Sequence, residues 1–152
     1  MKPSLKWAGA VWMALLLCMP AAADDLLMAR ANRMFPEAMT LLQSAISSRG
    51  YTVTRLQQVN ENLQRREFQS DMYRVVYFGK LEEVRRATAR NPNLIPFLPL
   101  NITIFAEGDQ SILVASHPQM LQEFFPDPEL KALFERWEKD MVEIMDEVRE
   151  EK

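Results

Sequence analysis

His117 and Met120 are the residues whose types and spacing come closest to a site for chemistry. They lie three positions apart at the expected start of a short helix, where an imidazole and a thioether can face the same ligand. Both groups are suitable ligands for copper or for a haem iron. His117 is the only histidine, and we favour a structural role beside the helix start over a metal site. Any haem would be held non-covalently, because the Cys-x-x-Cys-His motif is absent.

A catalytic carboxylate is the second kind of chemistry to consider, with Glu107 or Asp109 acting in a cleft. These residues flank Gly108, and acidic residues beside a glycine are more often solvated turn formers. The sequence lacks the Gly-x-Ser-x-Gly and His-Glu-x-x-His motifs, and four glycines in total leave no phosphate-binding loop. A carboxylate-based hydrolase is therefore an alternative to the non-catalytic protein that we expect.

Arginines cluster at positions 65–66 and 85–90. Glutamates lie beside both clusters, so solvated and ion-paired helix faces are the simplest interpretation. A cleft for an anionic ligand, formed by Arg74 together with these arginines, is the alternative. The sequence has no longer basic tract, and nucleic acid is therefore a poor candidate partner.

Residues 1–23 have the three parts of a secretory signal peptide. Two lysines are followed by a 12-residue apolar run ending at Cys18, and then by three alanines ending at Ala23. The run is shorter than the roughly 20 residues that span a bilayer. We therefore expect cleavage near Ala23 and a location in the bacterial periplasm or outside the cell. An uncleaved anchor and lipidation of Cys18 are the less favoured alternatives.

Cleavage would leave residues 24–152, which are enough for one domain with its own hydrophobic core. It would remove two of the 18 basic residues and none of the 21 acidic ones, so the net charge would be −5. It would also remove Cys18, the only cysteine, which excludes thiol catalysis and cysteine metal ligands. Because the acidic balance gives no attraction to anionic lipid, we expect no membrane association after cleavage.

Strand and helix signals alternate in the first half of this domain. Pro36 suits the first position of a helix, and Gly50 is the expected left-handed cap at its end. The run 72–78 is almost continuously apolar, which predicts a strand covered on both faces. The patterns predict strands at 26–33, 51–56 and 72–78, helices beginning at 36 and 81, and a short helix at 60–68.

The second half contains the positions with possible chemistry. A proline-punctuated stretch at 91–99 leads into a predicted hairpin, with strands at 100–104 and 111–116 and the turn at 107–109. Pro118 is expected to begin a short helix. Asp127 and Pro128 form a strong start signal for a final helix over 128–150.

The final helix carries an apolar stripe with successive spacings of 4, 3, 4, 3 and 4 residues. Such a stripe packs against the protein's own sheet in most globular domains, and we favour that interpretation. A dimer contact is the alternative, because the stripe extends over three heptads. Its members are Leu130, Phe134, Trp137, Met141, Ile144 and Val148.

Five short segments together carry a resemblance to a known family. They are Arg49 to Val53, Tyr77 to Gly79, Phe97 to Phe105, Glu107 to Asp109, and Ser116 to Pro118. Together they resemble the domain-of-unknown-function 302 (DUF302) family. The similarity spans about residues 26–125, and the final helix matches less specifically. The resemblance implies a compact α+β fold with a twisted, mainly antiparallel sheet, often as a dimer, and it supplies no catalytic residues. His117 departs from the family pattern, which more often has an acidic residue there.

We therefore expect a single α+β domain over residues 24–152, with helices packed on its sheet. The absence of catalytic motifs favours an exported, non-catalytic binding or interaction module, which we expect to be a homodimer with a small ligand or a protein partner. A periplasmic copper- or haem-binding protein that uses His117 and Met120 is the first alternative, and a carboxylate-based hydrolase is the second.

Overall fold

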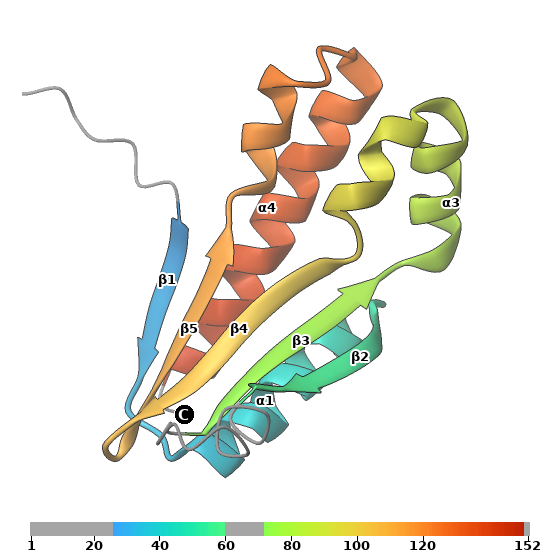
Figure 1. Ribbon diagram of the computed structural model, residues 1–152. Coiled ribbons are helices and arrows are strands. Elements are labelled where there is room, and N and C mark those ends of the chain that lie inside the picture. Colours follow the sequence, from blue (N-terminus) through green and yellow to red (C-terminus); the bar gives the residue numbers. More distant parts are fainter. Residues whose placement is uncertain (1–25, 60–71, 151–152) are drawn as a thin grey trace, which may run out of the picture.

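The computed structural model describes residues 26–59 and 72–150 of the protein. These residues form a five-stranded sheet of order β1-β5-β4-β3-β2, in which every neighbouring pair is antiparallel (Figure 1). The strands are β1 (Leu26–Ala31), β2 (Thr52–Gln58), β3 (Tyr73–Gly79), β4 (Leu100–Glu107) and β5 (Gln110–Ser116). β1 and β2 are therefore the two edges of this sheet.

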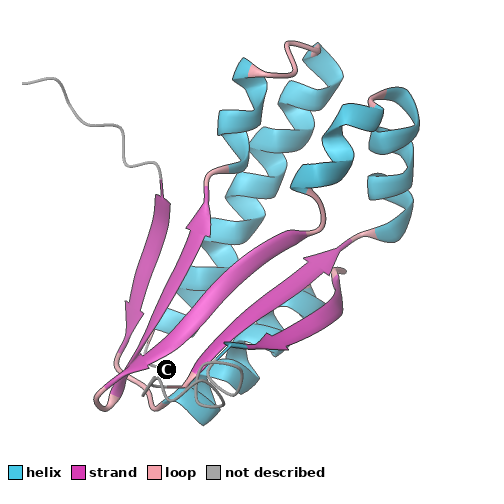
Figure 2. Ribbon diagram, viewed as in Figure 1, coloured by secondary structure: helices cyan, strands magenta, loops and turns pink. Residues whose placement is uncertain are grey.

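Two long helices, α1 (Phe35–Ser48) and α4 (Pro128–Arg149), cover one face of the sheet (Figures 1 and 2). Helix α3 (Leu81–Arg90) and the 3₁₀ helix η1 (Pro92–Phe97) connect β3 to β4 and project beyond the end of the sheet. We call this pair the α3–η1 arm. A second 3₁₀ helix, η2 (Pro118–Glu123), precedes α4. The predicted α+β class is confirmed.

Helix α1 ends at the predicted glycine. Gly50 has a φ of +75°, a left-handed conformation that costs glycine little. Its N–H donates to the carbonyl of Ser47, and the N–H of Tyr51 donates to the carbonyl of Ile46. This pair of hydrogen bonds is the Schellman motif, and it turns the chain directly into β2.

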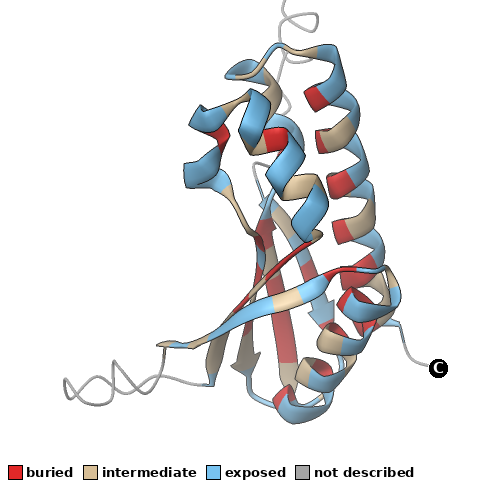
Figure 3. Ribbon diagram, turned by 90° about the vertical axis from the view of Figure 1, so that its right-hand side faces the viewer, coloured by how far each residue is buried: buried red, intermediate tan, exposed pale blue. Residues whose placement is uncertain are grey.

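Helix α4 begins at the predicted cap, where the Asp127 carboxylate accepts hydrogen bonds from the N–H groups of Glu129 and Leu130. Its apolar stripe faces inward (Figure 3). All six stripe residues are buried in the protein's own core: Leu130, Phe134, Trp137, Met141, Ile144 and Val148. A dimer that used this stripe as its contact would have to unpack that core.

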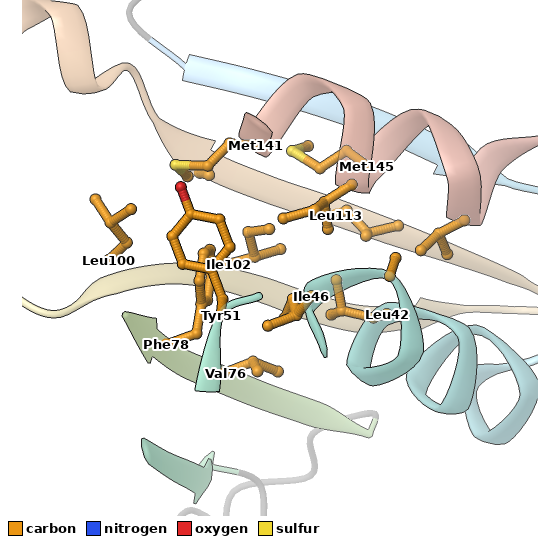
Figure 4. Packing of buried hydrophobic residues seen from close by; sticks show 14 of the residues in the cluster. Leu42, Ile46, Tyr51, Val76, Phe78, Leu100, Ile102, Leu113, Met141 and Met145 are labelled. Atoms are coloured by element: carbon orange, nitrogen blue, oxygen red, sulfur yellow. The ribbon is translucent and has the colours of Figure 1, made fainter. Parts of the chain in front are cut away.

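The core lies between the sheet and the two long helices (Figure 4). Val76, Phe78 and Ile102 from the strands are fully buried, as are Leu42 and Ile46 from α1. Burying a side chain of this size contributes about 1.5–3 kcal/mol relative to leaving it exposed. The packing of α1 and α4 on one sheet face is therefore the main source of stability in the described part of the chain.

The strand predicted at residues 72–78 is present as β3, but the prediction that it is covered on both faces is wrong. Val76 and Phe78 point into the core and are buried, but Tyr73, Val75 and Tyr77 point to the opposite face and are only half-buried. The described helices α1 and α4 leave this face open (Figure 3). The apolar run arose because tyrosine and valine suit the half-exposed face of an antiparallel sheet.

The remaining elements follow the predictions with smaller differences. The predicted helix from Pro118 is the six-residue 3₁₀ helix η2, and the proline-punctuated stretch contains η1. The predicted helix at 60–68 lies outside the described residues. Among the residues that are described, no helix is both long enough and apolar enough to cross a membrane.

Candidate functional site

A pocket with a volume of about 540 Å³ lies between the α3–η1 arm and the adjoining end of the sheet. That volume is within the range of roughly 300–1,000 Å³ that is usual for small-molecule sites. The pocket lies on the open face of the sheet, away from α1 and α4. Its lining residues are Thr52, Thr54, Gly79, Leu81, Val84, Thr88, Ile95, Leu98 and Pro99.

The floor of the pocket is the row where β2, β3 and the start of β4 meet. Thr52 pairs with Gly79 in the register of β2 and β3, and Phe78 pairs with Leu100, which places Pro99 beside Gly79. A side chain at position 79 would occupy this floor, because its Cβ would lie 3.4 Å from the Val84 side chain and 3.9 Å from Pro99. The absence of a side chain at Gly79 therefore deepens the pocket.

The walls of the pocket are aliphatic and partly open to solvent. Leu81 is 69% exposed and Ile95 is 58% exposed, which is unusual for large apolar side chains that line a concavity. None of the described lining residues is charged. These residues therefore supply no acid, base or metal ligand, and what they offer chemically is mainly apolar binding surface.

Polar contacts hold the arm against α4. The Glu83 carboxylate accepts hydrogen bonds from the indole N–H of Trp137 and, at 2.5 Å, from the guanidinium of Arg136. Glu83 is only 12% exposed, so this contact is shielded from solvent. Burial lowers the pKa of Arg136, but the hydrogen bond and charge of Glu83 outweigh burial and raise it. An exposed ion pair between Arg90 and Glu129 adds a second contact.

A second polar cluster lies at the base of the arm. The Tyr51 hydroxyl donates a hydrogen bond of 2.6 Å to Asp140 on α4, and the Lys80 ammonium lies 4.3 Å from the centre of the Tyr51 ring. Burial, followed by the hydrogen bond to Asp140, raises the pKa of the Tyr51 hydroxyl above its ordinary value. Tyr51 also packs edge-on against Phe78 (Figure 4). The proton therefore stays on Tyr51, and the cluster ties β2, α3 and α4 together.

The structure places His117 next to α4 and leaves Met120 at the surface. Nδ1 of His117 lies 3.2 Å from a carboxylate oxygen of Glu138, and the same carboxylate accepts from the backbone N–H of Gln119. Met120 is exposed. Within the described ranges, no group of three or more His, Cys, Asp or Glu side chains has the geometry to hold a metal ion. His117 and Met120 would supply two ligands at most.

The other predicted site residues lie apart from the pocket. Glu107 pairs with Arg30, and Asp109 is exposed in the hairpin turn, where Gly108 has a φ of +63°. Arg74 lies over the Phe35 ring at the opposite end of the sheet from the arm. The arginines at 65–66 lie outside the described residues. The arginines of 85–90 are on the arm, where the side chain of Arg85 pairs with Glu82.

Sequence reasoning missed the pocket as a site. Its lining comes from three separated segments, 52–54, 79–88 and 95–99, and consists of threonine, glycine, proline and aliphatic residues. These residue types carry no chemical signature, and only the folded chain brings them together. The one available signal was the proline-punctuated apolar stretch at 91–99, which has more apolar residues than a solvent-exposed connection needs.

Comparisons with known proteins agree with this fold. The sequence profile of the family "Domain of unknown function DUF302" matches residues 27–148. The crystal structure of the uncharacterized conserved protein DUF302 from Bacillus stearothermophilus superimposes with a TM-score of 0.76, at 22% identity over 84% of this chain and all of that one. No curated protein matches the sequence. Because the profile covers most of the chain, including the final helix, the protein belongs to the DUF302 family.

Proposed function

We propose that the protein is an exported, non-catalytic binding module that holds a small apolar ligand in the pocket beneath the α3–η1 arm. The observation that supports this function best is the lining of the pocket, whose described residues are mostly aliphatic and uncharged. Apolar concavities of this volume are the usual form of small-molecule sites. The signal peptide predicted at residues 1–23 supplies the expected location, the periplasm or the cell exterior.

Binding of a neutral fluorescent hydrocarbon amine, N-phenyl-1-naphthylamine, tests the pocket. We expect saturable binding to the wild type and at least a tenfold weaker affinity for Leu81→Asp, because the change replaces apolar wall with a carboxylate that a bound ligand would have to desolvate. Val142→Asp is the matched control, since Val142 is also an exposed apolar residue on a helix but lies on α4. Equal affinities for the two variants, or no saturable binding by the wild type, would reject the proposed site.

The homodimer that we expect would use the open face of the sheet. Met28, Val114 and Thr103 form one row across β1, β5 and β4 on that face, and Met28 is 67% exposed. Phe105 lies in the next row and packs edge-on against Tyr73. Apolar residues grouped on a sheet face that α1 and α4 do not cover favour contact with a second copy. This half of the face is on the β1 side, so the contact would leave the pocket on the β2 side accessible.

Sedimentation equilibrium at tens of micromolar tests the dimer. Wild-type protein should sediment at twice the chain mass, and Val114→Lys should sediment at the mass of one chain, because the lysine would place a charge in the apolar contact. Lys131→Met, a change on the exposed side of α4, should leave the dimer intact. A wild-type monomer under these conditions would remove the homodimer from the proposal and leave the pocket unaffected.

The metal alternative has one supporting observation. A carboxylate on Nδ1 of His117 would orient the imidazole with Nε2 outward, as carboxylates that accept from a metal-bound histidine do in many metal sites. Metal analysis and an absorption spectrum of periplasm-purified protein test this alternative. Retained copper or haem that is lost in His117→Ala would favour it over apolar binding.

For the hydrolase alternative, a substrate screen that compares the wild type with the Glu107→Ala, Asp109→Ala double variant is the corresponding test.

A further inference from the structure

The row of residues next to the pocket floor is polar, whereas the pocket is mostly apolar. Register pairs place Arg55, Tyr77 and Asn101 side by side across β2, β3 and β4. Tyr77 is two residues from Gly79 on the same strand and the same face, a distance of about 7 Å at roughly 3.4 Å per residue. An elongated ligand that lies on Gly79 would therefore bring one of its ends to the row of Arg55, Tyr77 and Asn101.

Arg55 is the cation of this row. Its guanidinium lies over the Tyr77 ring, 5.8 Å from the ring centre, an arrangement that limits its freedom through a cation–π contact. The Tyr77 hydroxyl in turn donates to the side chain of Gln57. Arg55 is exposed, and within residues 26–59 and 72–150 its guanidinium has no ion pair with a carboxylate. It is therefore a positioned cation whose charge is available to a ligand.

The pocket itself is unsuited to a charged group. The Thr88 hydroxyl donates to the carbonyl of Val84 at 2.8 Å, and the Thr54 hydroxyl donates to the carbonyl of Tyr77 at 3.3 Å. Because both hydrogens are directed at backbone carbonyls, Thr54 and Thr88 offer no donor to an anion in the pocket. Thr52, the third threonine among the described lining residues, is exposed and offers one hydroxyl at most. A carboxylate buried in the pocket would therefore lose more hydration than this hydroxyl could replace, whereas the neighbouring row offers the charge of Arg55.

We infer that the ligand is an anionic amphiphile with a single hydrocarbon body, which occupies the pocket while its anionic head contacts the Arg55 guanidinium. This inference rests on the proposed function, since it requires the pocket to bind apolar molecules. Arginine is suited to the head because its planar fork can donate two hydrogen bonds to one carboxylate. Asn101, exposed in the same row, adds an amide donor.

Isothermal titration with three ten-carbon ligands tests the inference: decanoate, decanol and decyltrimethylammonium. The three share one chain and differ in head charge. Decanoate should bind about fivefold more tightly than decanol, which is the upper end for a solvent-exposed ion pair. Decyltrimethylammonium should bind more weakly than decanol. Acetate, which has the anionic head without the hydrocarbon chain, should not bind at millimolar concentration. Decanoate should bind at concentrations at which it is monomeric and forms no vesicles.

Two variants assign the head contact. Arg55→Gln should bind decanoate and decanol with equal affinity and leave the decanol affinity unchanged. Arg86→Gln is the matched control, because Arg86 is an exposed arginine on the arm that lines the separate groove between α3 and α4. It should retain the preference for decanoate.

The outcomes separate the two proposals. If decanoate and decanol bind the wild type equally, the inferred anionic head is wrong while apolar binding stands. A decanoate preference that survives in Arg55→Gln would equally overturn the role of Arg55. If none of the three ligands binds and the naphthylamine probe also fails, the proposed function itself is wrong.

Discussion

Seven of the 22 residues of α4 are buried, whereas Ala87 is the only buried residue among the ten of α3. The two helices are therefore attached to the same sheet in different ways. Helix α4 is held by a continuous apolar stripe in contact with the sheet and α1. Helix α3 is held mainly by polar contacts from Glu83, Lys80 and Arg90.

This difference is the basis for the place where we propose that the protein binds a ligand. A helix that buries its apolar face completely has no surface left for a ligand. The arm leaves Leu81 and Ile95 exposed around a concavity, and its polar contacts to α4 keep it in place without filling the space beneath it. The apolar surface that the arm does not use for folding is the surface that we propose for binding.

The largest expected effect is on the α4 side of the comparison. Phe134 is fully buried and lies 5.7 Å from Trp137, ring centre to ring centre. Phe134→Ala should lower the free energy of unfolding by about 3–5 kcal/mol, because it removes apolar contacts and leaves a cavity. Urea denaturation followed by circular dichroism measures this change. Val142→Ala on the exposed side of α4 should cost less than about 1 kcal/mol, and a similar loss in both variants would contradict the assigned role of the stripe.

The next effect tests the polar attachment of the arm. Glu83→Ala would leave the indole N–H of Trp137 without its acceptor in a nearly solvent-free position. A buried donor that loses its partner costs about 1–3 kcal/mol, so we expect a loss of about 2 kcal/mol in urea denaturation. Glu82→Ala is the control, because Glu82 is the neighbouring carboxylate but is highly exposed. If both variants lose the same amount, polar contacts do not hold the arm.

The Tyr51 cluster, which joins the two regions, makes a prediction about pH. Burial and then the hydrogen bond to Asp140 raise the pKa of the Tyr51 hydroxyl above its ordinary value of about 10. Above pH 10 the unfolded chain releases this proton and the folded chain keeps it. The stability that Tyr51 contributes is therefore complete below pH 10 and declines above it, by at most about 1.4 kcal/mol per pH unit.

Comparison with Tyr51→Phe isolates this contribution. The wild type should exceed the variant in unfolding free energy at pH 9, and the difference should shrink when both are measured at pH 11. Other groups that titrate in this range are common to both proteins and cancel in the difference. A difference that is the same at the two pH values would show that Tyr51 ionises as readily in the folded chain as in the unfolded one.

Sequence patterns predicted the α4 side well because its signals are local. Asp127 and Pro128 mark the start of the helix, and the stripe repeats within one helix. At the end of α1, the N–H groups of Gly50 and Tyr51 donate to carbonyls three and five positions earlier. Each feature is determined by neighbours in the chain. The error at residues 72–78 has a different cause, since whether a strand is covered on its second face depends on elements that its own sequence does not contain.

The arm and the pocket were beyond sequence reasoning for the same physical reason. Glu83 and Trp137 are 54 residues apart, and nothing local to either one indicates that they meet. His117 was singled out because it is the only histidine, but its contact with Glu138 on α4 was not predictable from the spacing to Met120. Sequence reasoning identified residues with reactive side chains, whereas the pocket is made of unreactive ones.

The substitution with the smallest expected effect on stability is the one that distinguishes a role in folding from a role in binding most directly. Leu81→Ser should change the free energy of unfolding by less than about 0.5 kcal/mol, because Leu81 is 69% exposed and contributes little to the core. The same change should weaken binding of N-phenyl-1-naphthylamine several-fold, since it removes apolar wall from the pocket. Both quantities are measured on one preparation, by urea denaturation and by fluorescence titration. A loss of stability comparable to that of Phe134→Ala would mean that the arm, like α4, is held by apolar packing, and the contrast between the two helices would not explain where a ligand binds.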